Sequence, residues 1–364
     1  MAKTYFLPGE FMVYYNIRRK PNGVYIMKLT FDQIKSACSG AVDITQEDGL
    51  IRFHRMQQAQ LDGILALSEV YYGRAHSTAG VKLDFRTDSA SLFLDINASR
   101  GTMSYFAVDI IVDGTLIGSV DNFSHEEIPV FHAKKAYQLG DYSGRFDLGP
   151  GEKTVRVHLP WGPVAAIREL SLDDGATFIP AVPEKKVLFY GDSITQGMDC
   201  LHPSQTYSAR ISDALGMAEY NKAIAGTPTY LPISAVREEF TPDVVVVAYG
   251  TNDWTLTDTQ TFRTNYRTMH EHIRDHYSGV PVFALTPLFR YQMNECRVMG
   301  AFCKVAPIIQ EVCADFPDVT VVDCFPFIRQ DHLCFGDGIL HPNAKGFDYY
   351  FKGLWPQMKA VLEE

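Results

Sequence analysis

The sequence lacks any long hydrophobic run. No stretch of apolar residues could span a bilayer, and the first ten residues contain neither the apolar region nor the small-residue cleavage site of a secretory signal. Apolar residues nevertheless make up 46% of the chain and charged residues 21%, which is typical of a globular protein and not of a disordered one. We therefore expect no membrane partner and a cytoplasmic location.

Positive charge is also scarce, because 33 Lys and Arg residues stand against 43 Asp and Glu residues and give a formal net charge of −10. A nucleic-acid partner would require a concentrated basic face to displace counterions, so we expect none. The seven cysteines are odd in number, scattered, and form no Cys-x-x-Cys pair. This distribution favours reduced thiols over a disulfide framework.

The 364 residues exceed what one hydrophobic core usually serves, and the hydrophobic pattern changes near the middle of the chain. In the first half, apolar and polar residues alternate, as in 91–96 and 154–159, which indicates half-buried strands. Turn signals separate these strands. We predict an antiparallel, jelly-roll-like β-sandwich over 1–180 as an accessory domain, interrupted by one short helix near 56–65.

From residue 186 onward, continuous apolar strands alternate with long amphipathic segments. The expected strands are 187–190, 243–248, 280–285 and 319–323, and the expected helices are about 206–215, 230–240, 258–278, 295–315 and 343–362. This alternation predicts a parallel sheet covered by helices on both faces, in a second domain over 186–364. The polar, proline-interrupted segment 180–186 is the expected linker.

Ser193 lies in the sequence Gly-Asp-Ser-Ile-Thr-Gln-Gly, directly after the apolar strand at 187–190. A strand-to-helix turn of this kind lifts a hydroxyl out of the sheet and points backbone N–H groups at the atom that it attacks. Gly226 and Asn252 also follow expected strand ends. Because ligands of an open parallel sheet bind outside the carboxyl ends of its strands, we expect these three residues to meet at one rim.

A serine hydroxyl is a weak nucleophile and needs a base, normally a histidine that a carboxylate holds in the right tautomer. The sequence Asp-Gly-Ile-Leu-His near the C-terminus offers His341 as this base and Asp337 as the carboxylate. The oxyanion of a tetrahedral intermediate would be bound by the backbone N–H groups of Ser193 and Gly226 and by the side-chain amide of Asn252. Each such donor is worth roughly 3–4 kcal/mol in comparable sites.

Residues beside these blocks have supporting roles in this interpretation. Asp192 is expected to hydrogen-bond amides of the serine turn, and Asp253 is expected to brace the loop that carries Asn252. Trp254, directly after that pair, is either a wall of an acyl or sugar pocket or a packed core residue, and the sequence does not separate the two.

Together, the Gly-Asp-Ser block at 191–193, the block at Gly226, the Gly-Thr-Asn-Asp block at 250–253 and the final Asp/His pair resemble the motifs of the SGNH hydrolases, also called GDSL esterases and lipases. The resemblance spans 186–364. It implies a flavodoxin-like three-layer α/β/α fold, no metal or other cofactor, and hydrolysis or transfer of acyl groups on oxygen esters.

The final block departs from the family pattern. The family usually places its aspartate three residues before the histidine, whereas here that position is Gly338 and Asp337 lies four residues before His341. Either one residue is looped out and Asp337 still reaches the ring nitrogen, or a backbone carbonyl orients His341, as in family members that work as a dyad.

The first half of the chain, through segments such as 77–89 and 159–163, resembles the jelly-roll domain that precedes the hydrolase in some bacterial carbohydrate esterases of this superfamily. This resemblance implies removal of a short acyl group, most often acetyl, from a sugar hydroxyl, so the expected partner is a small-molecule or oligosaccharide ester. The same catalytic parts would also serve an acyltransferase. A carbohydrate-binding protein with an inactive hydrolase half is the third alternative.

Overall fold

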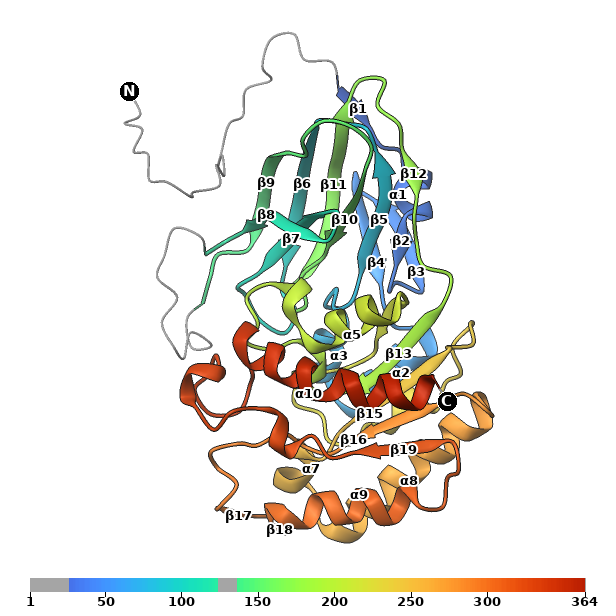
Figure 1. Ribbon diagram of the computed structural model, residues 1–364, viewed down its shortest axis with the longest axis vertical. Helices are drawn as coiled ribbons and strands as arrows, with labels where there is room; N and C mark the ends of the chain where they lie inside the picture. The colour runs from blue at the N-terminus through green and yellow to red at the C-terminus, as the bar shows by residue number, and fades with distance from the viewer. Residues whose placement is uncertain (1–25, 124–135, 364) are drawn as a thin grey trace.

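The computed structural model describes residues 26–123 and 136–363, which form two bodies stacked along the long axis of the molecule (Figure 1). A β-sandwich with antiparallel sheets lies at one end, and a parallel sheet covered by helices lies at the other. The predicted fold class is therefore confirmed. The limits of 1–180 and 186–364 as two domains stay a prediction.

Two antiparallel sheets face each other in the sandwich. One sheet has the order β3 (Asp43–Glu47), β4 (Leu50–His54), β11 (Val164–Asp173), β6 (Ser91–Ser99) and β9 (Gly140–Asp147), with β1 (Ile26–Lys28) also on β11. The other has the order β12 (Ile179–Pro180), β5 (Lys82–Thr87), β10 (Lys153–His158), β7 (Ala107–Val112) and β8 (Thr115–Asp121), with β2 (Cys38–Ser39) on β5. Their inner faces share one core that includes Phe85, Leu94 and Val157.

Within residues 26–123 and 136–180, the first half of the chain forms the helices α1 (Phe31–Ser36), α2 (Gln58–Leu67) and α3 (Glu69–Ala75). The sequence predicts one helix near 56–65, and the structure has the pair α2 and α3, joined at Ser68, whose hydroxyl caps α3. Leu61 and Ile64 of α2 pack in the same core as Leu188 and Tyr190 of the parallel sheet. The first half of the chain therefore contributes to the core of the second.

The α/β body contains a five-stranded parallel sheet of order β14 (Ala218–Asn221), β13 (Lys186–Gly191), β15 (Val244–Ala248), β16 (Val282–Leu285) and β19 (Val319–Val322). Helices α5 (Tyr207–Leu215) and α10 (Ala344–Leu362) cover one face, and α8 (Thr259–His276) and α9 (Val305–Cys313) cover the other. Alternate residues of β13 serve the two cores, with Leu188 on the α8 face and Phe189 on the α10 face. This is the strand order of a flavodoxin-like, doubly wound sheet.

Several elements differ from the expected ones. Strand β14 is not among the expected strands, because its sequence, Ala-Glu-Tyr-Asn, contains no apolar run. Its Glu219 forms an ion pair with the buried Lys82 of the sandwich. The helix expected over 230–240 is only the short α6 (Leu231–Ser234). The segment expected as a helix over 295–315 begins as the hairpin of β17 (Cys296–Arg297) and β18 (Gly300–Ala301), followed by the turn η3 (Phe302–Lys304) and α9. Gly300 has a left-handed backbone, with φ at 93°, which a helix would not contain.

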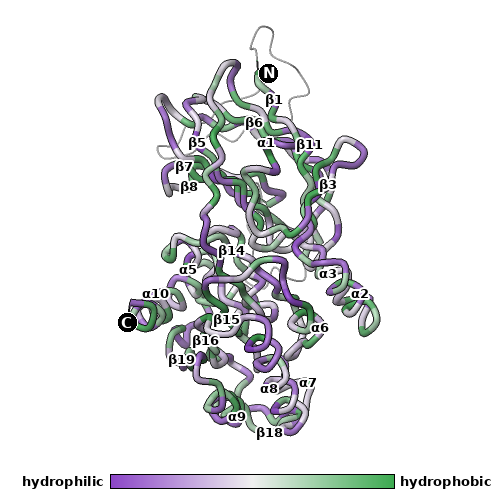
Figure 2. The backbone as a smooth tube through the Cα atoms, turned by 90° about the vertical axis from the view of Figure 1, so that its right-hand side faces the viewer, coloured by the Kyte–Doolittle hydropathy of each residue, from purple (hydrophilic) through white to green (hydrophobic). Residues whose placement is uncertain are grey.

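The hydropathy of the backbone is mixed along both bodies, and apolar segments concentrate in their interiors (Figure 2). Among the helices of the described ranges, none has both the length and the apolar character needed to cross a membrane.

Candidate active site

The carboxyl ends of three neighbouring strands form the rim that carries the expected residues. Ser193 follows β13 and begins the one-turn helix α4 (Ser193–Gln196), Gly226 follows β14, and Asn252 lies in α7 (Thr251–Leu256) after β15. Asp192 caps α4, because its Oδ1 accepts a hydrogen bond of 3.0 Å from the N–H of Ile194. The turn thus presents a serine hydroxyl at the start of a helix.

Glycine at position 191 is required where the strand meets this turn. A Cβ atom at Gly191 would lie 2.3 Å from the hydroxyl oxygen of Thr195 and 3.1 Å from the carbonyl oxygen of Ala248. A larger residue would therefore push α4 away from the sheet and move Ser193 off the rim.

Ser193, His341 and Asp337 form one hydrogen-bonded chain. The hydroxyl oxygen of Ser193 lies 2.9 Å from Nε2 of His341, and Nδ1 of His341 lies 2.8 Å from Oδ2 of Asp337. The other carboxylate oxygen of Asp337 accepts hydrogen bonds from the N–H groups of Ile339, Leu340 and His341 at 2.8, 2.8 and 3.1 Å. With a left-handed Gly338 (φ 72°), the four-residue spacing still brings the carboxylate to the ring.

The surroundings of Asp337 and His341 determine the charge that each side chain carries. Burial opposes ionisation of Asp337, but the hydrogen bond and charge of His341, together with the backbone N–H donors, lower its pKa to about 2. Burial likewise opposes protonation of His341, yet the Asp337 bond and the charges of Asp199, Asp337 and Asp192 raise its pKa above the ordinary value. Asp337 is therefore ionised at neutral pH, and His341 is a stronger base than a free imidazole.

The three expected oxyanion donors belong to the segments that follow β13, β14 and β15. The N–H groups of Ser193 and Gly226 have no hydrogen-bond acceptor among the described residues, and the side-chain amide of Asn252 donates to the carbonyl of Thr227 at 3.1 Å. Gly226 has a left-handed backbone, and a Cβ atom there would lie 2.6 Å from the guanidinium of Arg74. These donors are of the kind that binds an oxyanion.

Asp253 connects two of the rim loops. Its Oδ1 accepts from the N–H of Thr229 at 2.9 Å and its Oδ2 from the N–H of Gly250 at 3.0 Å. Burial raises its pKa to about 6, and burial also raises the pKa of Asp192 to about 7. Both side chains thus contact backbone amides of rim loops.

Trp254 does not form a wall of an open pocket. Its side chain is fully buried, its indole N–H donates to the carbonyl of Gly300 at 2.7 Å, and it packs edge-on against Phe302. Of the two alternatives that the sequence leaves open, the packed core residue is the one that the structure contains.

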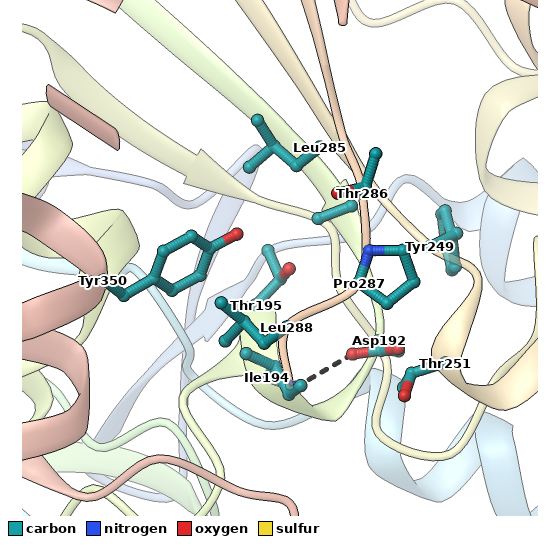
Figure 3. Close-up of a pocket in the computed structure, with 11 residues that line it drawn as sticks. Asp192, Ile194, Thr195, Tyr249, Thr251, Leu285, Thr286, Pro287, Leu288 and Tyr350 are labelled. Atoms are coloured by element: carbon teal, nitrogen blue, oxygen red, sulfur yellow. Dashed lines mark hydrogen bonds between the residues drawn. The ribbon is translucent and has the colours of Figure 1, made fainter. Parts of the chain in front are cut away.

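A small cavity borders the serine turn at Asp192 and Thr195 and is also lined by Leu285, Pro287 and Tyr350 (Figure 3). The volume in which the centre of a water molecule can lie is about 20 Å³, so the cavity has room for about one water. Ser193 is not among its lining residues. The cavity is therefore a packing feature behind the turn and is too small for a substrate.

Side chains from the first half of the chain hold the loop that carries Gly226. Arg55 donates to the carbonyls of Asn221 and Ala223 at 2.8 and 2.7 Å, and the Tyr71 hydroxyl donates to the carbonyl of Gly226 at 3.0 Å. These contacts join positions more than 150 residues apart. No local pattern in the sequence indicates them.

Gln196 connects the serine turn to the same loop and to the sandwich. Its Oε1 accepts from the N–H of Ala225 at 2.7 Å, and its Nε2 donates to Ser77, Thr102 and the carbonyl of Trp161. The rim is thus built from both halves of the chain.

A second carboxylate lies behind His341. Asp199 is fully buried, and its Oδ2 is 3.7 Å from Nδ1 of His341. Asp199, Asp337 and His341 offer ligand atoms within 4.8 Å of one another. Both ring nitrogens of His341 are engaged, with Ser193 and with Asp337, so a metal ion would have to displace one of these hydrogen bonds. The cluster is better suited to acid–base chemistry.

Residues 189–349 match the model of the GDSL-like lipase/acylhydrolase family. No protein of curated function matches the sequence. The chain is similar in structure to a salicylyl acyltransferase from a tetracycline biosynthetic pathway, with a TM-score of 0.75 and 20% identity, over 94% of this chain and 98% of that one.

Two carbohydrate esterases of family two are also similar in structure. The esterase from Clostridium thermocellum, in complex with cellohexaose, has a TM-score of 0.59 and 18% identity over 78% of this chain and 93% of its own. The esterase from Cellvibrio japonicus has a TM-score of 0.62 and 14% identity over 94% and 98%. At these identities the likeness shows the fold, which the neighbours share in both halves of the chain.

Proposed function

We propose that the protein is a serine esterase that removes a short acyl group, acetyl in the first instance, from an oxygen ester of a carbohydrate. The match of residues 189–349 to the GDSL-like lipase/acylhydrolase family supports the esterase part of this proposal. The observation that carries this proposal is the chain of contacts from the Ser193 hydroxyl through His341 to Asp337, at 2.9 and 2.8 Å. A nucleophile, a base and a group that orients the base are the parts that acyl transfer requires.

Acylation begins when Nε2 of His341 takes the proton of the Ser193 hydroxyl and the serine oxygen attacks the ester carbonyl carbon. Asp337 keeps the proton of His341 on Nδ1 and stabilises the imidazolium that forms, without taking a proton itself. The carbonyl electron pair moves to the oxygen, which the N–H groups of Ser193 and Gly226 and the amide of Asn252 bind. When the tetrahedral intermediate collapses, the ester C–O bond breaks and the sugar oxygen takes the proton from His341.

Deacylation repeats these steps with water. His341 takes a proton from the water, the hydroxide attacks the acyl carbon, and the bond to the Ser193 oxygen breaks. The serine oxygen then recovers its proton from His341, and the free acid leaves. Both half-reactions use the same base and the same three donors, so no further group is required.

The carbohydrate part of the proposal rests on two observations. The chain shares its two-body fold with carbohydrate esterases of family two, one of which was solved with cellohexaose. Polar, half-buried side chains of the first half of the chain, Tyr71 and Arg74, also lie at the loop that carries Gly226, where they donate to the carbonyls of Gly226 and Ala225. An acetyl group is the acyl chain that needs the least apolar surface.

The second candidate is an acyltransferase, in which an alcohol replaces water in deacylation. It is favoured by the salicylyl acyltransferase, which has a TM-score of 0.75 over nearly the full length of both chains. The two activities share the same acyl-enzyme and differ only in which acceptor reaches it.

The test is hydrolysis of p-nitrophenyl esters from acetyl upward, followed by acetylated xylo- and cello-oligosaccharides. We expect the acetyl ester to be cleaved fastest and acetate to be released from the sugars. Added glycerol or free oligosaccharide separates the two candidates, since ester product that outcompetes free acid indicates transfer. Sugar binding without any ester cleavage would contradict both and indicate a binding protein.

A further inference from the structure

We propose that Asp199 is a second carboxylate for His341 and that the β-sandwich holds it in position through Tyr105. Asp199 acts through His341 and is therefore a positioning residue. This inference rests on the proposed function only in taking His341 as the base. It gives the sandwich a direct part in the chemistry of the site.

The contacts of Asp199 reach in two directions. Its Oδ2 lies 3.7 Å from Nδ1 of His341, on the ring nitrogen that also binds Asp337 at 2.8 Å. Its Oδ1 accepts a hydrogen bond of 2.8 Å from the hydroxyl of Tyr105, and its own N–H lies 3.2 Å from the same hydroxyl oxygen. Tyr105 belongs to the sandwich and is itself buried.

The sandwich also fixes the backbone on which Asp199 lies. The next residue, Cys200, accepts a hydrogen bond of 2.6 Å at its carbonyl from the indole N–H of Trp161. Trp161 and Tyr105 pack edge-on, with ring centroids 5.6 Å apart. Asp199 has a left-handed backbone, with φ at 68°, which a residue other than glycine keeps only where its surroundings impose it. These contacts impose it.

Because Asp199 is buried, its charge interacts more strongly with His341 than an exposed charge would. Its side chain is fully buried, whereas that of Asp337 is 21% exposed, so solvent screens Asp199 less. A buried carboxylate is costly unless it faces a compensating charge. The imidazolium of His341, which forms each time Ser193 loses its proton, is such a charge. In the part of the chain that the structure describes, the carboxylates of Asp337, Asp199 and Asp192 each raise the pKa of His341, against the effect of burial.

The proposal predicts that His341 is a stronger base because of Asp199. The test is an NMR titration of the His341 imidazole in the full chain, since this measurement does not depend on turnover. The spectrum of His341→Ala identifies the signal. We expect Asp199→Asn to lower the His341 pKa by about one unit, because it removes one of the negative charges within a few ångströms. The acidic limb of kcat/KM should move to lower pH by the same amount.

Asp109→Asn is the matched control. Asp109 is also a fully buried carboxylate of the sandwich, and its Oδ1 lies 2.8 Å from Nδ1 of His202. Burial opposes protonation of His202, but Asp109 raises its pKa. Asp109→Asn should therefore lower the His202 pKa and leave that of His341 unchanged. An unchanged His341 pKa in Asp199→Asn, or an equal shift in Asp109→Asn, would overturn the proposal.

If Asp199→Asn does not fold, the His341 pKa in Asp337→Asn tests the proposal instead. With Asp199 still present, we expect His341 to keep a pKa near the ordinary histidine value. Without a carboxylate, a buried histidine has a lowered pKa, as in His270, where burial lowers the pKa to about 4. A His341 pKa near that of His270 would overturn the proposal. Absence of Ser193-dependent ester cleavage would instead contradict the proposed function and leave the titration result intact.

Discussion

At the scale of single residues, substitution of Ser193, His341 or Asp337 should lower kcat by different factors. Ser193→Ala and His341→Ala remove the nucleophile and the base, so each should lower kcat by roughly 10⁴-fold or more. Asp337→Asn should cost less, because Asp199 still lies 3.7 Å from the ring of His341. Steady-state kinetics on p-nitrophenyl acetate measures all three, with His272→Ala as the histidine control outside the rim. Equal losses for the three rim variants would mean that Asp337 is indispensable.

The pH dependence of kcat/KM belongs to the same scale. The pKa of Asp337 is about 2, so this carboxylate stays ionised throughout the working range and does not produce a limb there. The pKa of His341 is raised above the ordinary value of about 6.5, and His341 is a base only when neutral. Activity should therefore fall as pH drops through a midpoint above 6.5. A midpoint near 4 would indicate a carboxylate base and contradict the assignment.

At the scale of elements, the loop after β14 leaves little room for a side chain at position 226. Gly226 is left-handed, and a Cβ atom there would meet Arg74 at 2.6 Å. Gly226→Ala should displace the N–H donor and lower kcat by about 10²–10³-fold, besides a strain of about 1–2 kcal/mol.

Gly175→Ala is the matched control for that loop, because Gly175 has a similar φ of 74° and no atom within 4 Å of the added Cβ. It should show the same strain in urea unfolding and unchanged kcat. Equal kinetic effects of the two substitutions would show that Gly226 has no special place at the rim.

The elements also show what the sequence can predict. Ser193, Gly226 and Asn252 could be placed at one rim because each follows a strand end, and the topology of a parallel sheet gathers such ends. His341 lies 19 residues after the end of β19, so its part in the site is predicted from the Asp-Gly-Ile-Leu-His block and not from the sheet. The sequence does not indicate strand β14, because Ala-Glu-Tyr-Asn is not an apolar run, and it does not separate α3 from α2, because a single residue joins them. The sequence does not indicate the position of Asp199 either, because that position depends on contacts with Tyr105 and Trp161, which are far away in the chain. No local pattern encodes such a contact.

At the scale of the whole molecule, the two bodies share a core and a rim. Ile64 of α2 is fully buried against residues of the parallel sheet, whereas its neighbour Leu65 is 46% exposed. Ile64→Ala should lower the free energy of unfolding by about 2–5 kcal/mol, and Leu65→Ala by about 0.5 kcal/mol or less. Urea unfolding, followed by circular dichroism of the helices, checks both. A small effect of Ile64→Ala would mean that α2 packs only loosely on the α/β body.

The central claim is tested most directly by the rate of p-nitrophenyl acetate cleavage in the wild type, Ser193→Ala and Ser234→Ala, measured side by side. Ser234 is a suitable control, because its hydroxyl also contacts a histidine, His272, at 3.1 Å, but away from the rim. We expect cleavage by the wild type and Ser234→Ala and none above background by Ser193→Ala. Cleavage that survives in Ser193→Ala would contradict an acyl-enzyme on Ser193.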